Sequence, residues 1–292
     1  MKIIPVNFNH EIAKANRIRT LFRFLNWQIK SRICKRDIVQ NWIGEAKFYV
    51  KNGETGLTQN IYVGLAEFED MSFLMHCLRD SDYFFDVGSN SGSYSILGGA
   101  VAGAKVVAVE PIRETYKRLC QNLILNKLDK SSVALNVGLG SEIGFLEMTS
   151  TFDTTNRIVI GKSEEITTVV EISTLDEISK NMNATLIKID VEGWETEVLK
   201  GGYKTLQNPT LLALIIELNG SGRRYGHSDT EILQILKLFS FKPYSYEPFS
   251  RSLKLLEGKN QKNSNTIFIR NEIEIMKRIK NAPIIEILGT RV

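Results

Sequence analysis

The chain has 292 residues, of which 43% are hydrophobic and 24% are charged, and it contains only six prolines. This composition is ordinary for a globular protein and excludes a disordered, collagen-like or disulfide-rich chain. The formal net charge of +4 is too small to predict nucleic-acid binding by itself.

The cysteines and the hydropathy pattern bear on where the protein works. Cys34, Cys77 and Cys120 lie far apart and form no Cys-x-x-Cys pair, which argues against a disulfide framework and a structural zinc site. No apolar run approaches the roughly 18 residues that a membrane span needs, and the first residues lack the pattern of a signal peptide. We therefore expect a cytoplasmic protein.

Residues 1–80 predict an N-terminal extension that begins with a basic helix, "NRIRTLFRFLNWQIKSRICKR". Helical spacing places Leu21, Leu25 and Ile29 on one face, surrounded by lysines and arginines. Two interpretations stay open: peripheral contact with an anionic membrane, or packing against the core or a second subunit of a homodimer. Residues 47–64 then predict two strands around a turn, and a helix leads into the core.

Residues 82–220 alternate short apolar strands with helical segments, which is typical of a parallel sheet covered on both faces. Most of the strands are almost continuously apolar, as expected of strands buried on both sides. The predicted strands are 83–87, 105–110, 133–138, 185–190 and 211–218.

Helix signals separate these strands. Thr174-x-x-Glu177 and Ser228-x-x-Glu231 are capping-box patterns. Two later segments, 242–247 and 265–270, predict further strands before a closing helix. The predicted fold class is α/β: a doubly wound, seven-stranded, mostly parallel sheet in a domain of residues 81–292, preceded by the helix and hairpin extension.

The most informative polar residues follow the first two strands of this sheet. Ligands of such sheets bind beyond the carboxyl ends of the strands. Gly88 and Gly92 flank a tight turn after the first strand, Asp86 lies at that strand's end, and Glu110 ends the second strand. A carboxylate after the second strand can accept hydrogen bonds from both hydroxyls of a ribose.

The spacing Asp-x-Gly-x-x-x-Gly differs from the Gly-x-Gly-x-x-Gly of nicotinamide and flavin sites. Asp86 would also repel the pyrophosphate that such cofactors place at the helix N-terminus. A phosphate-binding P-loop is excluded because no Gly-Lys-Ser/Thr follows the turn. The turn therefore predicts a cofactor that carries a ribose and a positive charge.

Four segments together resemble the FkbM methyltransferase family: "FFDVGSNSGSYSILGG", "AVEPIRETYKRLCQNLILN", "TLIKIDVEGWETEVLKGG" and "LLALIIEL". The similarity runs from about Asn60 to Leu218, and "KIDVEGWE" is its most specific part. Ser89 departs from the commoner alanine, a small change. The resemblance implies a class I, Rossmann-like methyltransferase that binds S-adenosylmethionine (SAM) through six residues: Asp86, Gly88, Asn90, Gly92, Glu110 and Asp190.

The resemblance also implies methyl transfer to a hydroxyl oxygen, on a sugar of a bacterial polysaccharide, glycolipid or glycosylated natural product. General-base assistance would make such a hydroxyl a better nucleophile. Asp190 and Glu217 end the fourth and fifth predicted strands, where the methyl group is expected. Asp190 would act as the base or orient the acceptor, or both carboxylates would hold Mg²⁺. His227 is the remaining candidate base, or an idle residue before the Ser228 cap.

Four residues are candidates for binding the acceptor. Asp153 and Asn156 lie in the polar run 149–157, which either lines the acceptor pocket or is a solvated turn. Glu192 follows Asp190 closely, although Glu192 or Glu217 could instead cap a helix N-terminus or pair with Lys188 or Arg223. Trp194 would stack on a sugar or pack in the core.

Two other functions compete with sugar methylation. A methyltransferase acting on RNA or protein is one, but the sequence lacks an Asn/Asp-Pro-Pro-aromatic loop after the fourth strand and an aromatic platform for bases. We therefore expect no nucleic-acid partner. A non-catalytic, SAM-binding subunit of a glycan assembly complex is the other, although such a subunit need not keep these acids.

Overall fold

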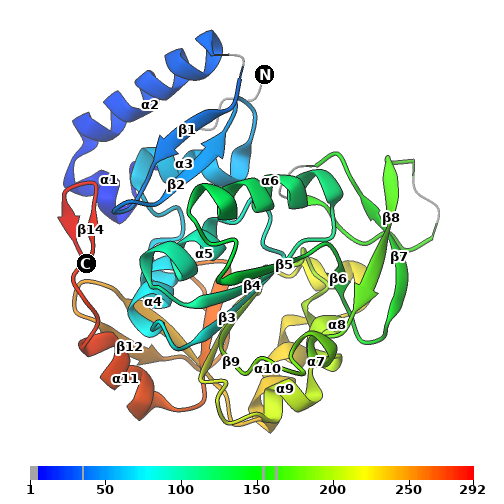
Figure 1. Ribbon diagram of the computed structural model, residues 1–292. Coiled ribbons are helices and arrows are strands. Elements are labelled where there is room, and N and C mark those ends of the chain that lie inside the picture. The colour runs from blue at the N-terminus through cyan, green and yellow to red at the C-terminus, as the bar shows by residue number, and fades with distance from the viewer. Residues whose placement is uncertain (1–5, 35, 153–154, 162–163) are drawn as a thin grey trace.

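A computed structural model describes residues 6–34, 36–152, 155–161 and 164–292 (Figure 1). Its centre is an eight-stranded sheet of order β12-β11-β13-β10-β9-β3-β4-β5. The five strands from β10 to β5 are parallel, and the other three join them antiparallel. The strands are β3 (Tyr83–Val87), β4 (Lys105–Val109), β5 (Ser132–Leu135), β9 (Ala184–Ile189), β10 (Ala213–Glu217), β11 (Lys242–Glu247), β12 (Ser252–Leu255) and β13 (Asn265–Ile269).

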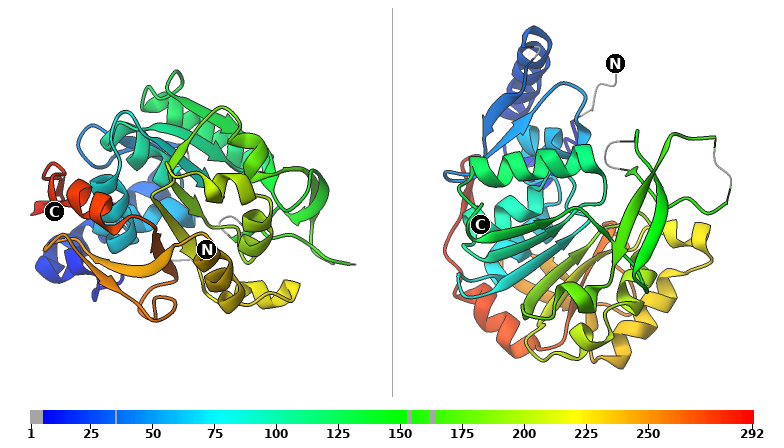
Figure 2. Two further views of the ribbon diagram at one scale, coloured as in Figure 1. Left: turned by 90° about the horizontal axis from the view of Figure 1, so that it is seen from below. Right: turned by 45° about the vertical axis from the view of Figure 1, so that its right-hand side comes forward.

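Helices cover both faces of this sheet, which confirms the doubly wound α/β class (Figure 2). One face packs against α4 (Phe68–Cys77), α5 (Ser93–Ile96) with the π-helix Leu97–Val101, α6 (Arg113–Leu125) and α11 (Glu272–Lys280). The other face packs against α7 (Leu175–Ile178), α8 (Glu195–Lys200), α9 (Tyr203–Gln207) and α10 (Asp229–Leu238). Neighbouring residues along β3 point to opposite faces, so Phe84 enters one core and Phe85 the other.

The sheet has one strand more than the seven predicted. The additional strand, β12, pairs with β11 through a short connection after Glu247. Its residues Ser252–Leu255 are only partly apolar, because an edge strand need not be buried on both sides. The third predicted strand, 133–138, was too long: it ends at Leu135.

A small second sheet of order β6-β8-β7 was not predicted. It is formed by β6 (Gly138–Leu139), β7 (Gly144–Thr149) and β8 (Thr167–Ser173). Ile172, Val170 and Met148 form an apolar cluster on it with Ile112 and Ile158. The chain thus builds a wall beside the carboxyl ends of β3 and β4 before it returns to β9 (Figure 1).

The predicted N-terminal hairpin was wrong in one strand. Lys47–Val50 is indeed a strand, β2, but it pairs with β1 (Ile38–Asn41). Residues Thr55–Val63 form helix α3 instead of a second strand. Leu57 and Ile61 follow each other at helical spacing and are both buried, so burial of one helix face outweighed the strand preference of "IYV".

Two further helices, α1 (Glu11–Ala15) and α2 (Arg17–Ile33), precede β1, and a hairpin of β14 (Glu286–Ile287) and β15 (Thr290–Arg291) ends the chain. Both predicted helix starts are confirmed, because the side chains of Thr174 and Ser228 accept the N–H of the residue three positions on. In the described residues, no helix is long and apolar enough to cross a membrane.

Candidate active site

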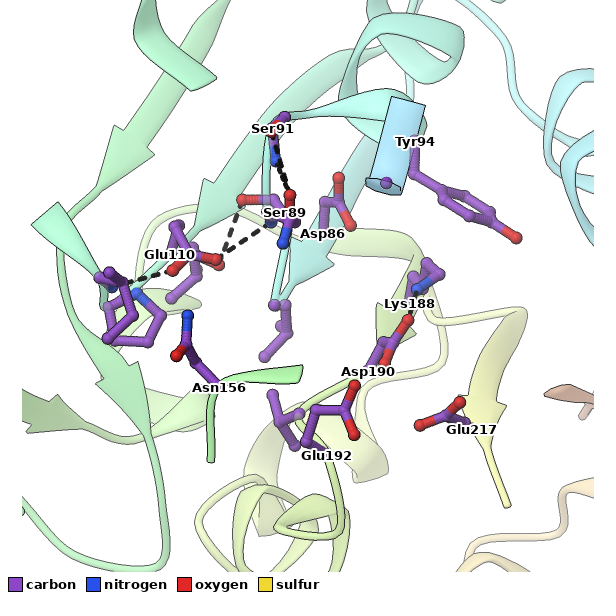
Figure 3. A pocket seen from close by; sticks show the side chains of 18 of the residues that line it. Asp86, Ser89, Ser91, Tyr94, Glu110, Asn156, Lys188, Asp190, Glu192 and Glu217 are labelled. Atoms are coloured by element: carbon purple, nitrogen blue, oxygen red, sulfur yellow. Dashed lines mark hydrogen bonds and ion pairs between the residues drawn. The ribbon is translucent and has the colours of Figure 1, made fainter. Parts of the chain in front are cut away.

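A cavity of about 350 Å³ lies at the carboxyl ends of β3, β4, β9 and β10 (Figure 3). Its volume falls in the range of small-molecule sites, roughly 300–1,000 Å³. The second sheet contributes apolar wall residues, and α3 closes another side with Gly56, Leu57 and Gln59. Most of the sequence-predicted cofactor and catalytic residues therefore meet at one cavity; Gly92 and His227 do not line it.

The turn after β3 is held against the loop after β9. Gly88 has a φ of +78°, and a Cβ placed on it would lie 1.8 Å from the backbone oxygen of Asp190. Only glycine fits such a contact without displacing the neighbouring loop. Gly92 also has a positive φ, of +90°, at the start of α5. Gly88 thus sets the distance between the two halves of the site, whereas Gly92 lets the turn pack against Leu119 of α6.

Glu110 spans from the end of β4 to this turn. One carboxylate oxygen accepts the N–H of Asn90 at 3.1 Å and the other accepts the N–H of Ile112 at 2.8 Å. Burial raises the pKa of Glu110 to about 7, although these two hydrogen bonds favour the carboxylate. Each oxygen keeps a lone pair for a further donor, as a ribose with two adjacent hydroxyls requires.

Asp86 lies deeper, at the end of β3. Its carboxylate accepts the hydroxyl of Ser95 at 2.6 Å, and its side chain is almost completely buried. Burial raises its pKa to about 6, partly offset by the positive charge of Lys188. A buried carboxylate of this kind attracts a cationic group that reaches the cavity floor.

These features fit SAM. Two buried carboxylates, on adjacent strand ends, offer acceptors for the ribose hydroxyls and for a cationic amino-acid end. Ile112, Leu139, Ile158 and Ile172 give an apolar surface on which an adenine can lie. When bound, SAM supplies a methyl group that its positively charged sulfur makes electrophilic.

The pKa of Glu110 predicts a pH-dependent affinity for SAM. A carboxyl group with a pKa near 7 is mostly neutral at pH 6.0 and mostly ionised at pH 7.5. If the ionised form binds the ribose, the dissociation constant should be roughly eightfold larger at pH 6.0 than at pH 7.5. Calorimetric titration at both pH values measures this. In Glu110→Gln this eightfold contribution should disappear and leave only the smaller change from Asp86, whose pKa is about 6; an unchanged ratio would contradict the assignment.

Three carboxylates lie on the opposite side of the cavity from Glu110 (Figure 3). Asp190 follows β9, Glu217 ends β10 and Glu192 lies in the loop after β9. One oxygen from each lies within 4.8 Å of the others, a spacing that would also suit a metal ion. The neighbouring strands β9 and β10 bring them together, as the sequence predicts.

Lys188 provides the positive charge of this cluster. Its ammonium lies 2.6 Å from Asp190 and 4.5 Å from the centre of the Tyr94 ring. Burial disfavours its charged form, but the charges of Asp190, Glu67 and Asp86 outweigh burial and raise its pKa. Sequence reasoning missed it as a site residue, although a lysine inside an otherwise apolar strand was a signal.

The two glutamates of the cluster bind protons more tightly than usual. Burial, followed by the charges of Asp190 and Glu192, raises the pKa of Glu217 to about 8. Burial and the charge of Asp190 raise the pKa of Glu192 to about 7. One oxygen of Glu217 is buried without a hydrogen-bond partner among the described residues. This carboxyl group is therefore poised to exchange a proton near neutral pH.

The predicted acceptor-binding residues differ in where the structure places them. Asn156 and Trp194 line the cavity, and Trp194 packs edge-on against Tyr225 at 4.9 Å between ring centres. The carboxamide oxygen of Asn156 accepts the N–H of Phe152, so it also shapes its own loop. Asp153 lies outside the described residues.

His227 is not among the residues that line the cavity. Its two ring nitrogens lie 3.0 Å from carboxylate oxygens of Glu197 and Glu231 on α8 and α10. The loop after β10 turns back through Ser221–Tyr225 before His227, a path that the sequence did not reveal. The geometry thus ties His227 to two helices, away from the cavity that Asp190 and Glu217 line.

We expect His227→Gln to change kcat by less than about twofold, because a general base must reach the proton that it removes. Initial rates at saturating SAM measure this, with circular dichroism as the control for folding. A decrease in kcat of tenfold or more at unchanged SAM affinity would indicate that His227 takes part in the reaction.

The fold and the acids at its strand ends define a SAM-dependent methyltransferase of class I. The sequence profile of the Methyltransferase FkbM domain matches residues 86–247, more than half of the chain. The protein therefore belongs to the FkbM methyltransferase family. The predicted resemblance is confirmed.

Three individual proteins that this chain is similar to share 28% or less of their aligned residues with it. Hexuronic acid methyltransferase AglP of Haloferax volcanii is 28% identical over 176 residues, which cover 60% of this chain and 68% of AglP. M. jannaschii TYW2 in complex with AdoMet is 12% identical, with a TM-score of 0.43 over 82% of this chain and 88% of that one. The Precorrin-6y C5,15-methyltransferase of Geobacter metallireducens GS-15 is 9% identical, with a TM-score of 0.41 over 76% and 92%.

Proposed function

We propose that the protein transfers the methyl group of SAM to a hydroxyl oxygen of a sugar. The observation that carries the proposal is the group of three carboxylates within 4.8 Å of one another, in the same cavity as the cofactor acids. Membership of the FkbM family supports methyl transfer. The name of the relative AglP, a hexuronic acid methyltransferase, supports a sugar acceptor.

The acids favour a hydroxyl over a carboxylate as the accepting group. The ammonium of Lys188 is already paired with Asp190, so it is not free to balance an anionic acceptor atom, which the ionised fraction of Glu192 and Glu217 would repel. A neutral hydroxyl instead gains a hydrogen-bond acceptor and loses its proton to one of the carboxylates as the new carbon–oxygen bond forms. We assign this proton to Glu217, whose pKa of about 8 suits a general base near neutral pH.

Asp190 and Lys188 have a supporting role in this proposal. The ammonium of Lys188 holds one oxygen of Asp190 at 2.6 Å, which fixes the direction of the other oxygen toward the acceptor. Trp194 and Asn156 line the cavity and would contact the sugar ring. Glycan assembly in the cytoplasm is the expected setting, with a sugar-containing acceptor as partner.

A divalent cation held by Asp190 and Glu217 is the second candidate mechanism, because their oxygens lie at a spacing that a metal can bridge. Lys188 already neutralises Asp190, so we favour the metal-free base. If a metal is used, EDTA should abolish transfer and Mg²⁺ should restore it. Unchanged rates in EDTA would support the base.

The proposal is tested by acceptor screening with methyl-labelled SAM. Neutral sugars, uronic acids, RNA and a protein mixture are incubated separately, and the labelled product is treated with alkali. An alkali-stable label on a sugar indicates a methyl ether and supports the proposal. An alkali-labile label indicates a carboxyl ester, and a label on RNA or protein indicates the competing class. SAM binding without transfer to any acceptor would favour the non-catalytic subunit.

A further inference from the structure

Helix α2 carries an exposed apolar stripe along its whole length. Five of its residues follow each other at spacings of three or four, so they lie on one face of the helix. Their exposed fractions range from 49% to 83%. The stripe, as defined here, consists of Ile18, Phe22, Leu25, Ile29 and Ile33.

The stripe is not the face by which α2 packs on the protein. Thr20, Trp27 and Ser31 are the buried residues of the helix, and Phe24 packs against Tyr62 of α3 at 5.3 Å between ring centres. Helical spacing places these residues opposite the stripe. Helix α2 lies at the outer edge of the molecule in each view (Figures 1 and 2). The sequence placed Leu21, Leu25 and Ile29 on a possible contact face, and the structure leaves them exposed.

Cations flank the stripe on both sides, and no acid accompanies them. The segment from Asn16 to Arg36 contains no aspartate or glutamate. Exposed cations flank the stripe, and within the described chain none of them forms an ion pair with a carboxylate. These flanking cations are Arg17, Arg19, Lys30 and Arg32, and the exposed Arg36 follows the end of the helix.

Together the apolar stripe and the flanking cations specify the partner. A second copy of the chain would bring the same cations against themselves, because a two-fold interface pairs a patch with itself. An anionic bilayer surface satisfies both features: the apolar side chains enter the acyl boundary while arginines and lysines contact phosphate groups. We propose that α2 docks the enzyme on a membrane rich in anionic lipid, lying in the plane of the interface.

This docking would place the active-site cavity close to the membrane. Helix α3 lines the cavity with Gly56, Leu57 and Gln59, and α2 packs on α3, with Arg23 donating to the backbone oxygen of Tyr62 at 2.8 Å. Only the thickness of α2 therefore separates the stripe from α3, which forms one wall of the cavity. The proposal does not depend on methyl transfer, so its test needs no acceptor.

The test is sedimentation of the full chain with vesicles of phosphatidylcholine alone or mixed with phosphatidylglycerol. We expect at least tenfold tighter binding to the mixed vesicles, weakened by salt. The double variant Phe22→Ser and Ile29→Ser should lose at least tenfold in affinity. The matched control Leu238→Ser and Ile273→Ser removes apolar residues of α10 and α11 that are even more exposed than Phe22 and Ile29, and it should bind as the wild type does.

Folding of each variant is checked by circular dichroism and by SAM titration, which α2 should not affect. Equal vesicle binding by the wild type and the stripe variant would overturn the proposal, as would no binding by the folded wild type. A concentration-dependent dimer in sedimentation velocity that the stripe variant abolishes, without vesicle binding, would assign the stripe to a second copy instead.

Discussion

Glu217→Gln is expected to lower kcat by a factor of about 10²–10⁴, the usual contribution of a general base. The amide keeps the size of the side chain but cannot accept the proton of the acceptor hydroxyl. Glu217 reaches the cavity from the end of β10, away from the cofactor acids Asp86 and Glu110 on β3 and β4. The dissociation constant of SAM should therefore change by less than about twofold.

The pH profile separates a base from a merely structural residue. Because the pKa of Glu217 is about 8, kcat/KM of the wild type for the acceptor, measured at saturating SAM, should rise with pH up to about 8 and then level off. In Glu217→Gln this rise should disappear. The exposed Glu257→Gln serves as a matched control with unchanged kinetics. A variant that loses activity but keeps the wild-type profile would contradict the assignment and point to a positioning role.

The sequence predicted the location of Asp86 and Glu110 well because both residues lie at strand ends. Asp86 and Glu110 each end a strand whose apolar run is visible in the sequence. In a parallel sheet the carboxyl ends of neighbouring strands lie together, so pattern alone placed both acids at one cavity. Asp190 and Glu217 were found by the same reasoning.

The parts that pattern could not predict depend on long-range packing. Thr55–Val63 became a helix because Leu57 and Ile61 are buried beneath α2 and β2, neighbours that the local sequence does not reveal. His227 follows the same strand as Glu217, yet the turn of Ser221–Tyr225 carries it away from the cavity. Loop paths of this kind are set by tertiary contacts.

Gly88 also has a long-range contact that the sequence pattern could not predict. The glycine was predicted from its place in a tight turn next to the cofactor. The structure adds that the backbone oxygen of Asp190, more than a hundred residues later in the chain, occupies the space of a side chain. Gly88 therefore joins the cofactor turn to the loop that carries the proposed catalytic acids.

Gly88→Ala is consequently expected to lower the free energy of unfolding by about 2–5 kcal/mol. The added Cβ would lie 1.8 Å from the backbone oxygen of Asp190, which cannot move without shifting the loop after β9. Gly226→Ala is the matched control: its φ of +82° is almost the same, but a Cβ there meets nothing within 4 Å. It should cost only the backbone strain, about 1–2 kcal/mol.

Urea unfolding of both variants measures the difference, which isolates the collision from the strain of a positive φ. Because the collision displaces Asp190, Gly88→Ala should also lose methyl transfer in whatever fraction remains folded, whereas Gly226→Ala should keep it. Equal destabilisation of the two variants would mean that the loop after β9 yields freely. In that case the contact between Gly88 and Asp190 would not hold the two halves of the site in place.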